Sequence, residues 1–254
     1  MEKEGAVLLL FTGGTISMSE DPATGALRPI DFGRLQELMP ELKQTGVHIK
    51  SIPFLPLIDS SDVQPDTWEK LALTIAEHYD DFDGFVVLHG TDTMAHSASA
   101  LSFMLENLAK PVIFTGAQLP VGMMRSDAKE NLLTAIEIAS AKENGHAIVP
   151  EVCIFFEDTL FRGNRTTKKN AEHFSAFNSY NYPALAKAGV HIKYFRSYIH
   201  YPEPGAKLRL RLKIDRNVAI LKLFPGITQH TVHAILNIPS LKAIVLESFG
   251  AGNA

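Results

Sequence analysis

Short runs of uninterrupted apolar residues constrain the fold of this chain more than any other feature of its sequence. Four such runs occur, at residues 6–11, 84–89, 111–116 and 152–156. Parallel strands that are buried on both faces of a sheet have this texture, because helices cover both sides. Helix-like patterns fill the intervals between the runs. The alternation predicts an α/β fold in which helices sandwich a mainly parallel sheet, a three-layer arrangement.

Three of those intervals carry the helix patterns. Apolar residues recur at three- and four-residue spacing over residues 65–82, and Pro65 suits a first helical turn. A second helix is expected after Thr93, which is a suitable N-cap, and a third is expected to end at Gly145, a suitable C-cap.

A change in composition divides the chain near residue 195. Residues 195–215 contain proline and glycine followed by alternating basic and leucine residues, which is typical of an interdomain connection that can pair as an exposed ribbon. One strand–helix–strand pattern follows it. We therefore predict an N-terminal domain over 1–194, a linker over 195–215, and a smaller C-terminal α/β domain over 216–254 that looks incomplete.

Composition and charge exclude several classes of protein. The net charge of −4 gives no reason to expect nucleic acid or an anionic membrane as partner. A single cysteine, Cys153, rules out an internal disulfide, and its apolar neighbours favour a core position. No apolar run reaches spanning length and no signal segment opens the sequence, so a soluble, cytoplasmic protein is expected. The histidines lack metal-ligand spacing, so we predict no metal.

Hydroxyl-bearing turns follow two of the apolar runs. "TGGTIS" follows the first run, and "GTDT" follows the second. Since ligands of open α/β sheets bind beyond the carboxyl ends of the strands, both turns could face one crevice. Thr15, Thr91, Asp92 and a lysine would supply a nucleophile, a relay hydroxyl, an acceptor and a cation. Each turn taken alone is also explained as a tight turn or a helix cap, and neither matches a phosphate-binding fingerprint.

The order of motifs along the whole chain resembles that of the bacterial-type asparaginases, and the cytosolic type I subgroup in particular. The seven matching motifs are "TGGTIS", "LHGTDTMAHSASALSFMLENL", "LIDSSDV", "VIFTGAQLP", "RSDAKENL", "LFRGNRTTKKN" and "SFGAGN". The resemblance implies hydrolysis of L-asparagine to L-aspartate and ammonia without a cofactor. It also implies a homo-oligomer, either a dimer or a tetramer built from tight dimers.

Site residues follow from the same resemblance. It implies that Thr15 is the nucleophile, on a mobile lid over residues 16–29, and that Thr91, Asp92 and Lys168 form a second triad. Lys168 would activate the Thr91 hydroxyl, and Asp92 would hold the lysine and reach the α-ammonium of the substrate. Asp59 and Ser60 match residues that bind the α-amino and α-carboxylate ends. Ala117 and the backbone of "GAQ" would line the amide pocket.

Two alternatives share this fold. One is the amidohydrolase subunit of a transfer-RNA-dependent amidotransferase, which carries an extra N-terminal domain, whereas here "FTGGTIS" begins at residue 11. The other is a non-catalytic amino-acid sensor, although every matched site position holds a chemically competent residue.

The chain departs from the family pattern in two places. Some relatives carry a tyrosine on the lid near Ala26, so the group that assists Thr15 is left open. Relatives also continue past "SFGAGN", so we expect the chain to be incomplete after Ala254 and to depend on oligomer formation, with Asn253 near substrate bound by a neighbouring subunit.

Overall fold

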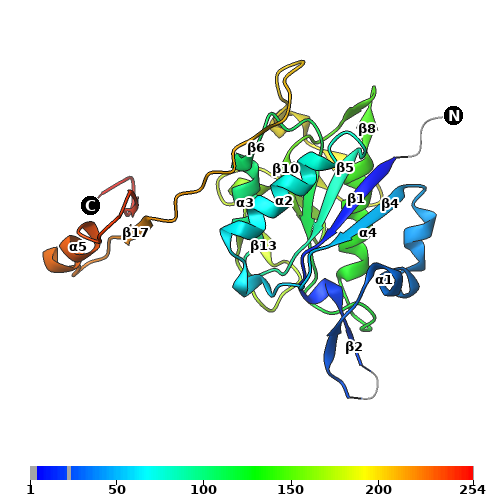
Figure 1. Cartoon of the computed structure of the whole chain (residues 1–254), viewed down its shortest axis with the longest axis horizontal. Coiled ribbons are helices and arrows are strands. Elements are labelled where there is room, and N and C mark those ends of the chain that lie inside the picture. The colour runs from blue at the N-terminus through cyan, green and yellow to red at the C-terminus, as the bar shows by residue number, and fades with distance from the viewer. Residues whose placement is uncertain (1–4, 22–23, 254) are drawn as a thin grey trace. The chain divides into compact units, whose positions relative to one another are not determined.

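The computed structural model describes residues 5–21 and 24–253 and divides them into two compact units, one that ends at Leu212 and one that begins at Lys213 (Figure 1). Two residues of the predicted lid segment, Pro22 and Ala23, and the C-terminal Ala254 lie outside the described residues. The first unit extends to Leu212 and so includes most of the predicted linker over residues 195–215. The predicted domain boundaries, which follow a change in composition, stay a prediction. No helix among the described residues is long and apolar enough to cross a membrane.

An eight-stranded sheet forms the centre of the first unit, in the order β15-β14-β11-β10-β7-β5-β1-β4. Strands β4, β1, β5, β7 and β10 run parallel, and β11, β14 and β15 continue the sheet antiparallel. The bounds of the eight strands are β1 Ala6–Phe11, β4 His48–Pro53, β5 Gly84–Leu88, β7 Val112–Thr115, β10 Val152–Phe156, β11 Thr159–Arg162, β14 Ala186–Lys187 and β15 Lys193–Tyr194. The predicted fold class, an α/β fold with a mainly parallel sheet, is confirmed.

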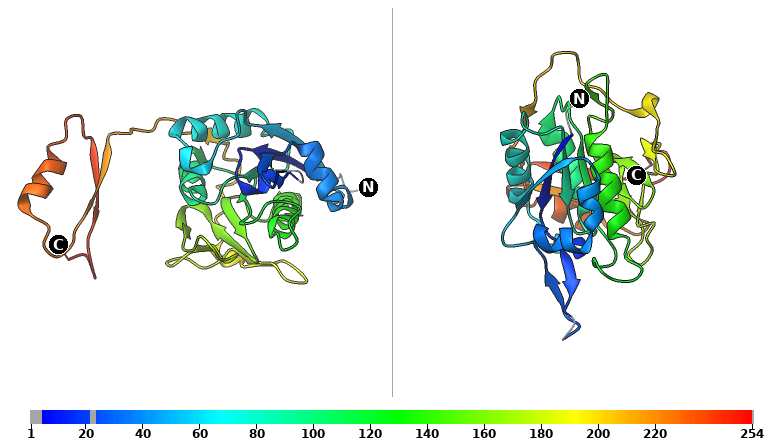
Figure 2. Two further views of the ribbon diagram at one scale, coloured as in Figure 1. Left: turned by 90° about the horizontal axis from the view of Figure 1, so that it is seen from below. Right: turned by 90° about the vertical axis from the view of Figure 1, so that its right-hand side faces the viewer.

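Helices cover both faces of this sheet, as the right-hand view of Figure 2 shows. Alternate residues of β1 point into two separate cores: Val7 and Leu9 join the cluster that includes α1 and α4, and Leu8 and Leu10 join the cluster with α2 and α3. This period of two explains why β1 is apolar at every position. The helices are α1 Phe32–Leu38, α2 Pro65–Glu77, α3 Met94–Met104 and α4 Ala128–Ser140.

Paired short strands surround the main sheet. They are β2 Met18–Glu20 with β3 Leu27–Pro29, β6 Leu105–Glu106 with β16 Arg209–Leu210, β8 Lys142–Glu143 with β9 His146–Ala147, and β12 Thr167–Lys168 with β13 Phe177–Asn178. Within residues 195–215, Arg209 and Leu210 of β16 pair with β6, and the ribbon over the whole segment stays a prediction. The β2–β3 hairpin occupies the predicted lid segment, and its second strand is exposed.

The third helix ends earlier than the sequence suggests. Gly145 does not cap it, because α4 ends at Ser140, and Asn144 and Gly145 form the turn between β8 and β9. Both residues have positive φ angles, 51° and 80°, which is the conformation of a two-residue hairpin turn. The Asn-Gly pair therefore acts as a hairpin signal here.

The second unit contains β17 (Val218–Lys222), α5 (Gln229–Leu236) and β18 (Ala243–Glu247), the strand–helix–strand order that the sequence suggests. The two strands pair in parallel, with Leu221 opposite Leu246 and Ile220 opposite Val245. Leu221 is buried, but Ile220 and Val245 are 63% and 53% exposed. One face of this small sheet is therefore apolar and uncovered among the described residues.

Candidate active site

Loops that follow neighbouring parallel strands meet at one edge of the main sheet. "TGGT" follows β1, "HGTDT" follows β5, "GAQL" follows β7, and "DSS" follows β4 by a short connection. These strands are adjacent in the order β7-β5-β1-β4 and run in the same direction. Their carboxyl ends therefore bring four of the predicted motifs to one edge, which is where α/β sheets bind ligands.

Glycines allow three of these loops to approach one another closely. A Cβ added at Gly14 would lie 2.4 Å from the backbone nitrogen of Gly90, and one added at Gly90 would lie 2.4 Å from Oγ of Ser60. Gly14 also has a φ of 84°, in the region that favours glycine. Thr15 and Thr91 each lie one residue beyond this contact, so the close approach brings the two threonine loops together.

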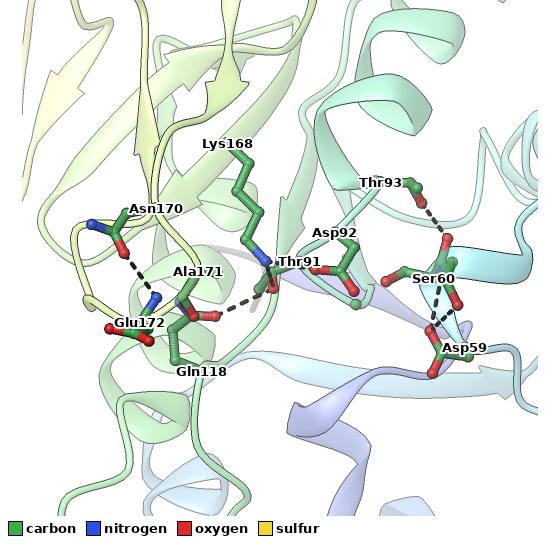
Figure 3. Close-up of polar contacts among 12 residues, drawn as sticks. Asp59, Ser60, Thr91, Asp92, Thr93, Gln118, Lys168, Asn170, Ala171 and Glu172 are labelled. Carbon is green, nitrogen blue, oxygen red and sulfur yellow. Dashed lines mark hydrogen bonds and ion pairs between the residues drawn. The ribbon is translucent and has the colours of Figure 1, made fainter.

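Lys168 reaches this edge from β12 and contacts both members of the "TD" pair (Figure 3). Its Nζ donates to Oγ1 of Thr91 at 2.8 Å and to Oδ1 of Asp92 at 2.7 Å. The lysine side chain is only 16% exposed, whereas that of Asp92 is 62% exposed. The three residues of the predicted triad therefore form one hydrogen-bonded cluster, with a shielded cation and an accessible carboxylate.

The two predicted binders of the substrate ends lie at the start of the 3-10 helix Ser60–Asp62. Asp59 Oδ1 accepts from the backbone nitrogen and the hydroxyl of Ser61, both at 2.9 Å. These bonds lower the pKa of Asp59, the backbone bond contributing most, so its carboxylate is ionised at neutral pH. Ser60 is buried, and its carbonyl accepts from Oγ1 of Thr93 at 2.6 Å. Thr93 precedes α3 as predicted, but its hydroxyl ties the helix start to Ser60 instead of capping the helix.

A buried histidine, His89, supports the loop that carries Thr91. The Nδ1–H of His89 donates to the carbonyl of Gly90 at 2.7 Å, and its Nε2 accepts from the Ser97 hydroxyl at 2.9 Å, which itself accepts from Trp68 Nε1. Burial lowers the pKa of His89 to about 4 and outweighs the Gly90 bond, so the ring is neutral. This histidine is a structural group, and among the described residues no cluster of His, Cys, Asp and Glu is placed to hold a metal ion.

The sequence did not single out the side chain of Gln118, which contacts the triad from the loop after β7, or the side chains that hold this loop. Gln118 Oε1 accepts from Oγ1 of Thr91 at 3.2 Å. Asp127 accepts from the backbone nitrogens of Gln118 and Leu119, and the fully buried Asn131 donates to Asp127 and to the carbonyl of Gly116. The motif "RSDAKENL" contains Asp127 and Asn131, and the polar Asn131 on the inward face of α4 was the available signal.

The structure brings most of the predicted site residues to the same edge of the sheet. Lys168, Thr91 and Asp92 contact one another directly, and Ser60 packs against Gly90 beside them. Thr15 is brought near through Gly14 and begins a 3-10 helix that leads into the β2–β3 hairpin. Ala117 is buried immediately after β7. Cys153 is fully buried in β10, where desolvation raises its pKa, which agrees with a core position.

Known proteins with similar sequences cover the whole chain. L-asparaginase 1 of Escherichia coli K12 is 42% identical over 100% of this chain and 73% of its own length. The 60 kDa lysophospholipase of Mus musculus is 40% identical, and this chain spans 48% of it. A glutamyl-tRNA(Gln) amidotransferase subunit of Pyrococcus abyssi is more distant, at 34% identity over 97% of this chain and 57% of its own length.

Comparison of structures gives the same relationship. The crystal structure of L-asparaginase I from Vibrio cholerae matches 99% of this chain and 74% of its own with a TM-score of 0.88 and 38% sequence identity. The protein-family model described as "Asparaginase, N-terminal" matches residues 6–200, and every residue of the candidate site lies in this range. The sequence, the fold and the domain match agree, and the chain belongs to the asparaginase family.

Proposed function

We propose that this protein is an L-asparaginase, an amidohydrolase that converts L-asparagine to L-aspartate and ammonia through a threonine nucleophile. The observation that carries the proposal is the contact of Lys168 with both Thr91 and Asp92, beside the loop of Thr15. A hydroxyl is a weak nucleophile without help, and this cluster supplies a cation and a second hydroxyl next to it. Family membership adds to the same conclusion.

In the proposed mechanism, Oγ1 of Thr15 attacks the side-chain carbonyl carbon of asparagine. A covalent acyl-enzyme ester forms as the carbon–nitrogen bond breaks, and the proton lost by the Thr15 hydroxyl ends on the amide nitrogen, which leaves as ammonia. Water then hydrolyses the ester, which regenerates the Thr15 hydroxyl and releases aspartate. Developing negative charge on the carbonyl oxygen would be stabilised by backbone N–H groups of the glycine turns. Thr91, hydrogen-bonded to Lys168, provides the hydroxyl through which a proton can be relayed.

Charge accounts for the choice of a free amino acid as substrate. Asp92 is an exposed carboxylate and Asp59 is ionised, so both suit an α-ammonium group. Ser60 and the N–H groups at the start of its 3-10 helix suit the α-carboxylate. Simple amides without the α-groups should therefore be poor substrates.

An ammonia-release assay tests the proposal. The protein should release ammonia from L-asparagine in the absence of transfer RNA, and release from propionamide should be far slower. No release from asparagine at any concentration would contradict the hydrolase and favour the sensor. Release that requires a transfer RNA would favour the amidotransferase subunit, which the lower identity of 34%, against 42%, makes the weaker candidate.

We also propose that the enzyme works in the cytoplasm as a homo-oligomer, a dimer or a dimer of dimers, without a cofactor. The exposed apolar face of β17 and β18 supports association with a further protein surface. Asn253, in the turn closed by Phe249, would approach the substrate of a neighbouring subunit. Sedimentation at several protein concentrations, together with the activity of Asn253→Ala, tests this assembly; an active monomer would contradict it.

A further inference from the structure

The hydroxyl of Thr91 has a limited set of hydrogen-bonding positions, and two are assigned by its neighbours. A threonine hydroxyl has one proton to donate and two lone pairs that accept. The ammonium of Lys168 has only protons to offer, so at 2.8 Å it occupies one lone pair of Thr91 Oγ1. The Thr91 proton must therefore point elsewhere, and Oε1 of Gln118 accepts it at 3.2 Å (Figure 3).

The side-chain amide of Gln118 is held in one orientation. Its Nε2 donates to the carbonyl oxygens of Ala171 and His173, both at 3.1 Å. Carbonyls accept only, so a flipped amide would place its own oxygen against these two oxygens. Oε1 must therefore face Thr91.

Both ends of this amide bridge are themselves anchored. The loop that carries Ala171 and His173 is shaped by Asn170, whose Oδ1 accepts from the backbone nitrogens of Glu172 and His173. The backbone nitrogen of Gln118 donates to Asp127, which Asn131 holds from the core. Gln118 therefore links the segment that follows Lys168 to the hydroxyl of Thr91.

We propose that Gln118 is a positioning residue that accepts the hydrogen bond of the Thr91 hydroxyl and thereby turns the free lone pair of that hydroxyl toward the crevice. Thr91 then meets the attacking group as a hydrogen-bond acceptor, with Lys168 behind it and its own proton directed away. This inference rests on the proposed function, because the orientation of the hydroxyl matters only if the attacking group contacts Thr91. It predicts that Gln118 affects the chemical step more than substrate binding.

Two substitutions at this position separate orientation of the hydroxyl from simple tethering of the loops. Gln118→Met keeps the size of the side chain and removes both the acceptor and the donors. Gln118→Glu keeps an acceptor for Thr91 and loses both donors to Ala171 and His173. Gln44→Met, on the exposed 3-10 helix Pro40–Gln44, is the control for a glutamine-to-methionine change.

The measurement is steady-state ammonia release, with thermal melting to verify that each variant is folded. If Gln118 orients Thr91, kcat of Gln118→Met falls on the order of tenfold or more while KM stays within about threefold. Gln118→Glu should then keep a kcat several times higher than that of Gln118→Met, and Gln44→Met should match the wild type.

Other outcomes overturn the inference. If Gln118→Glu is as slow as Gln118→Met, or slower, the amide acts as a tether between loops. If Gln118→Met raises KM and leaves kcat unchanged, Gln118 serves binding. Failure of Gln118→Met to fold would leave the ratio of Gln118→Glu to wild-type kcat as the test, and a loss above about tenfold with unchanged KM would count against the role. A wild-type protein that releases no ammonia contradicts the proposed function itself, which is a different result.

Discussion

The two threonine loops at the edge of the sheet are held in different ways. Thr91 is fixed through side chains, since Lys168 donates to its hydroxyl and Gln118 accepts from it. The Thr15 loop is fixed through its backbone and through the buried side chains that follow Thr15: Gly14 packs on Gly90, the carbonyl of Gly14 accepts from the backbone nitrogen of Ser17 at 3.0 Å, and Ile16 is fully buried. Beyond Ser17 the chain enters the β2–β3 hairpin, whose second strand is exposed.

The difference suggests a division of work between the loops. A hydroxyl with fixed donors and acceptors is preorganised, which is what a relay or a stabilising group needs. A hydroxyl whose position depends on backbone contacts can move with the segment that follows it. We therefore regard the Thr91 cluster as the rigid half of the site and the Thr15 loop as the half that completes it with substrate.

The largest expected effect lies in the loop of Thr15. Thr15→Ala should lower kcat by about a thousandfold or more, because loss of a nucleophile removes the covalent route. Stability should change little, since this hydroxyl lies in a turn outside the core. Ammonia release and thermal melting measure the two effects, and Thr74→Ala on α2 is the matched control. Near-normal turnover by a folded Thr15→Ala protein would remove Thr15 from the mechanism.

Substitutions in the Thr91 cluster should lower kcat less than Thr15→Ala does, and the effects of two such substitutions should depend strongly on each other. Thr91→Val and Lys168→Met should each lower kcat roughly a hundredfold, the scale of proton-transfer and electrostatic partners. The double substitution should lower kcat by much less than the product of the two single losses, because the two groups act as a unit. Lys169→Met, at the exposed neighbour, is the control. Kinetics of all four variants decide the matter, and multiplicative losses would mean that Thr91 and Lys168 act independently.

The contact that joins the two loops can be tested through stability. Gly14→Ala places a Cβ 2.4 Å from a backbone nitrogen and forces a left-handed φ of 84°. Strain and overpacking together should lower the free energy of unfolding by about 4 kcal/mol. Gly46→Ala has a similar φ of 66° and open space around its Cβ, so it should cost only about 1 to 2 kcal/mol. Denaturant unfolding compares them, and equal losses would show that the close approach of the loops is unimportant.

The buried, neutral His89 that supports the Thr91 loop predicts that the free energy of unfolding depends on pH. His89 has a pKa of about 4 in the folded chain, against an unperturbed value of 6.5. As the pH falls, the unfolded chain binds a proton at His89 before the folded chain does. The contribution of the neutral His89 ring to the free energy of unfolding is therefore fully present above pH 6.5 and declines as the pH falls to about 4. The decline should approach about 3 kcal/mol. The slope of unfolding free energy between these pH values should be smaller in His89→Gln; identical slopes would exclude His89 as its source.

Some elements could be predicted because their local pattern and their tertiary environment agree. Strands β1, β5, β7 and β10 are apolar at nearly every position, and both of their faces are covered. Strand β4 could not be predicted in this way, because "HIKSIP" mixes charged, polar and apolar residues, as suits the edge of the sheet. The predicted end of α4 is wrong because glycine serves both as a helix cap and as a hairpin turn, and the chain beyond Ser140 decides which.

Local patterns were enough to predict the parallel sheet and the hydroxyl-bearing turns at two strand ends, and the resemblance supplied the candidate site residues. How these residues meet depends on the packing of the folded chain. Lys168 is 76 residues from Asp92 along the chain, and no periodicity encodes a contact between the short strand β12 and the turn that follows β5 in another sheet. The same holds for Gln118, whose partners Thr91 and Ala171 are 27 and 53 residues away. Local sequence sets which residues end a strand, whereas strand order and loop packing set which ends become neighbours.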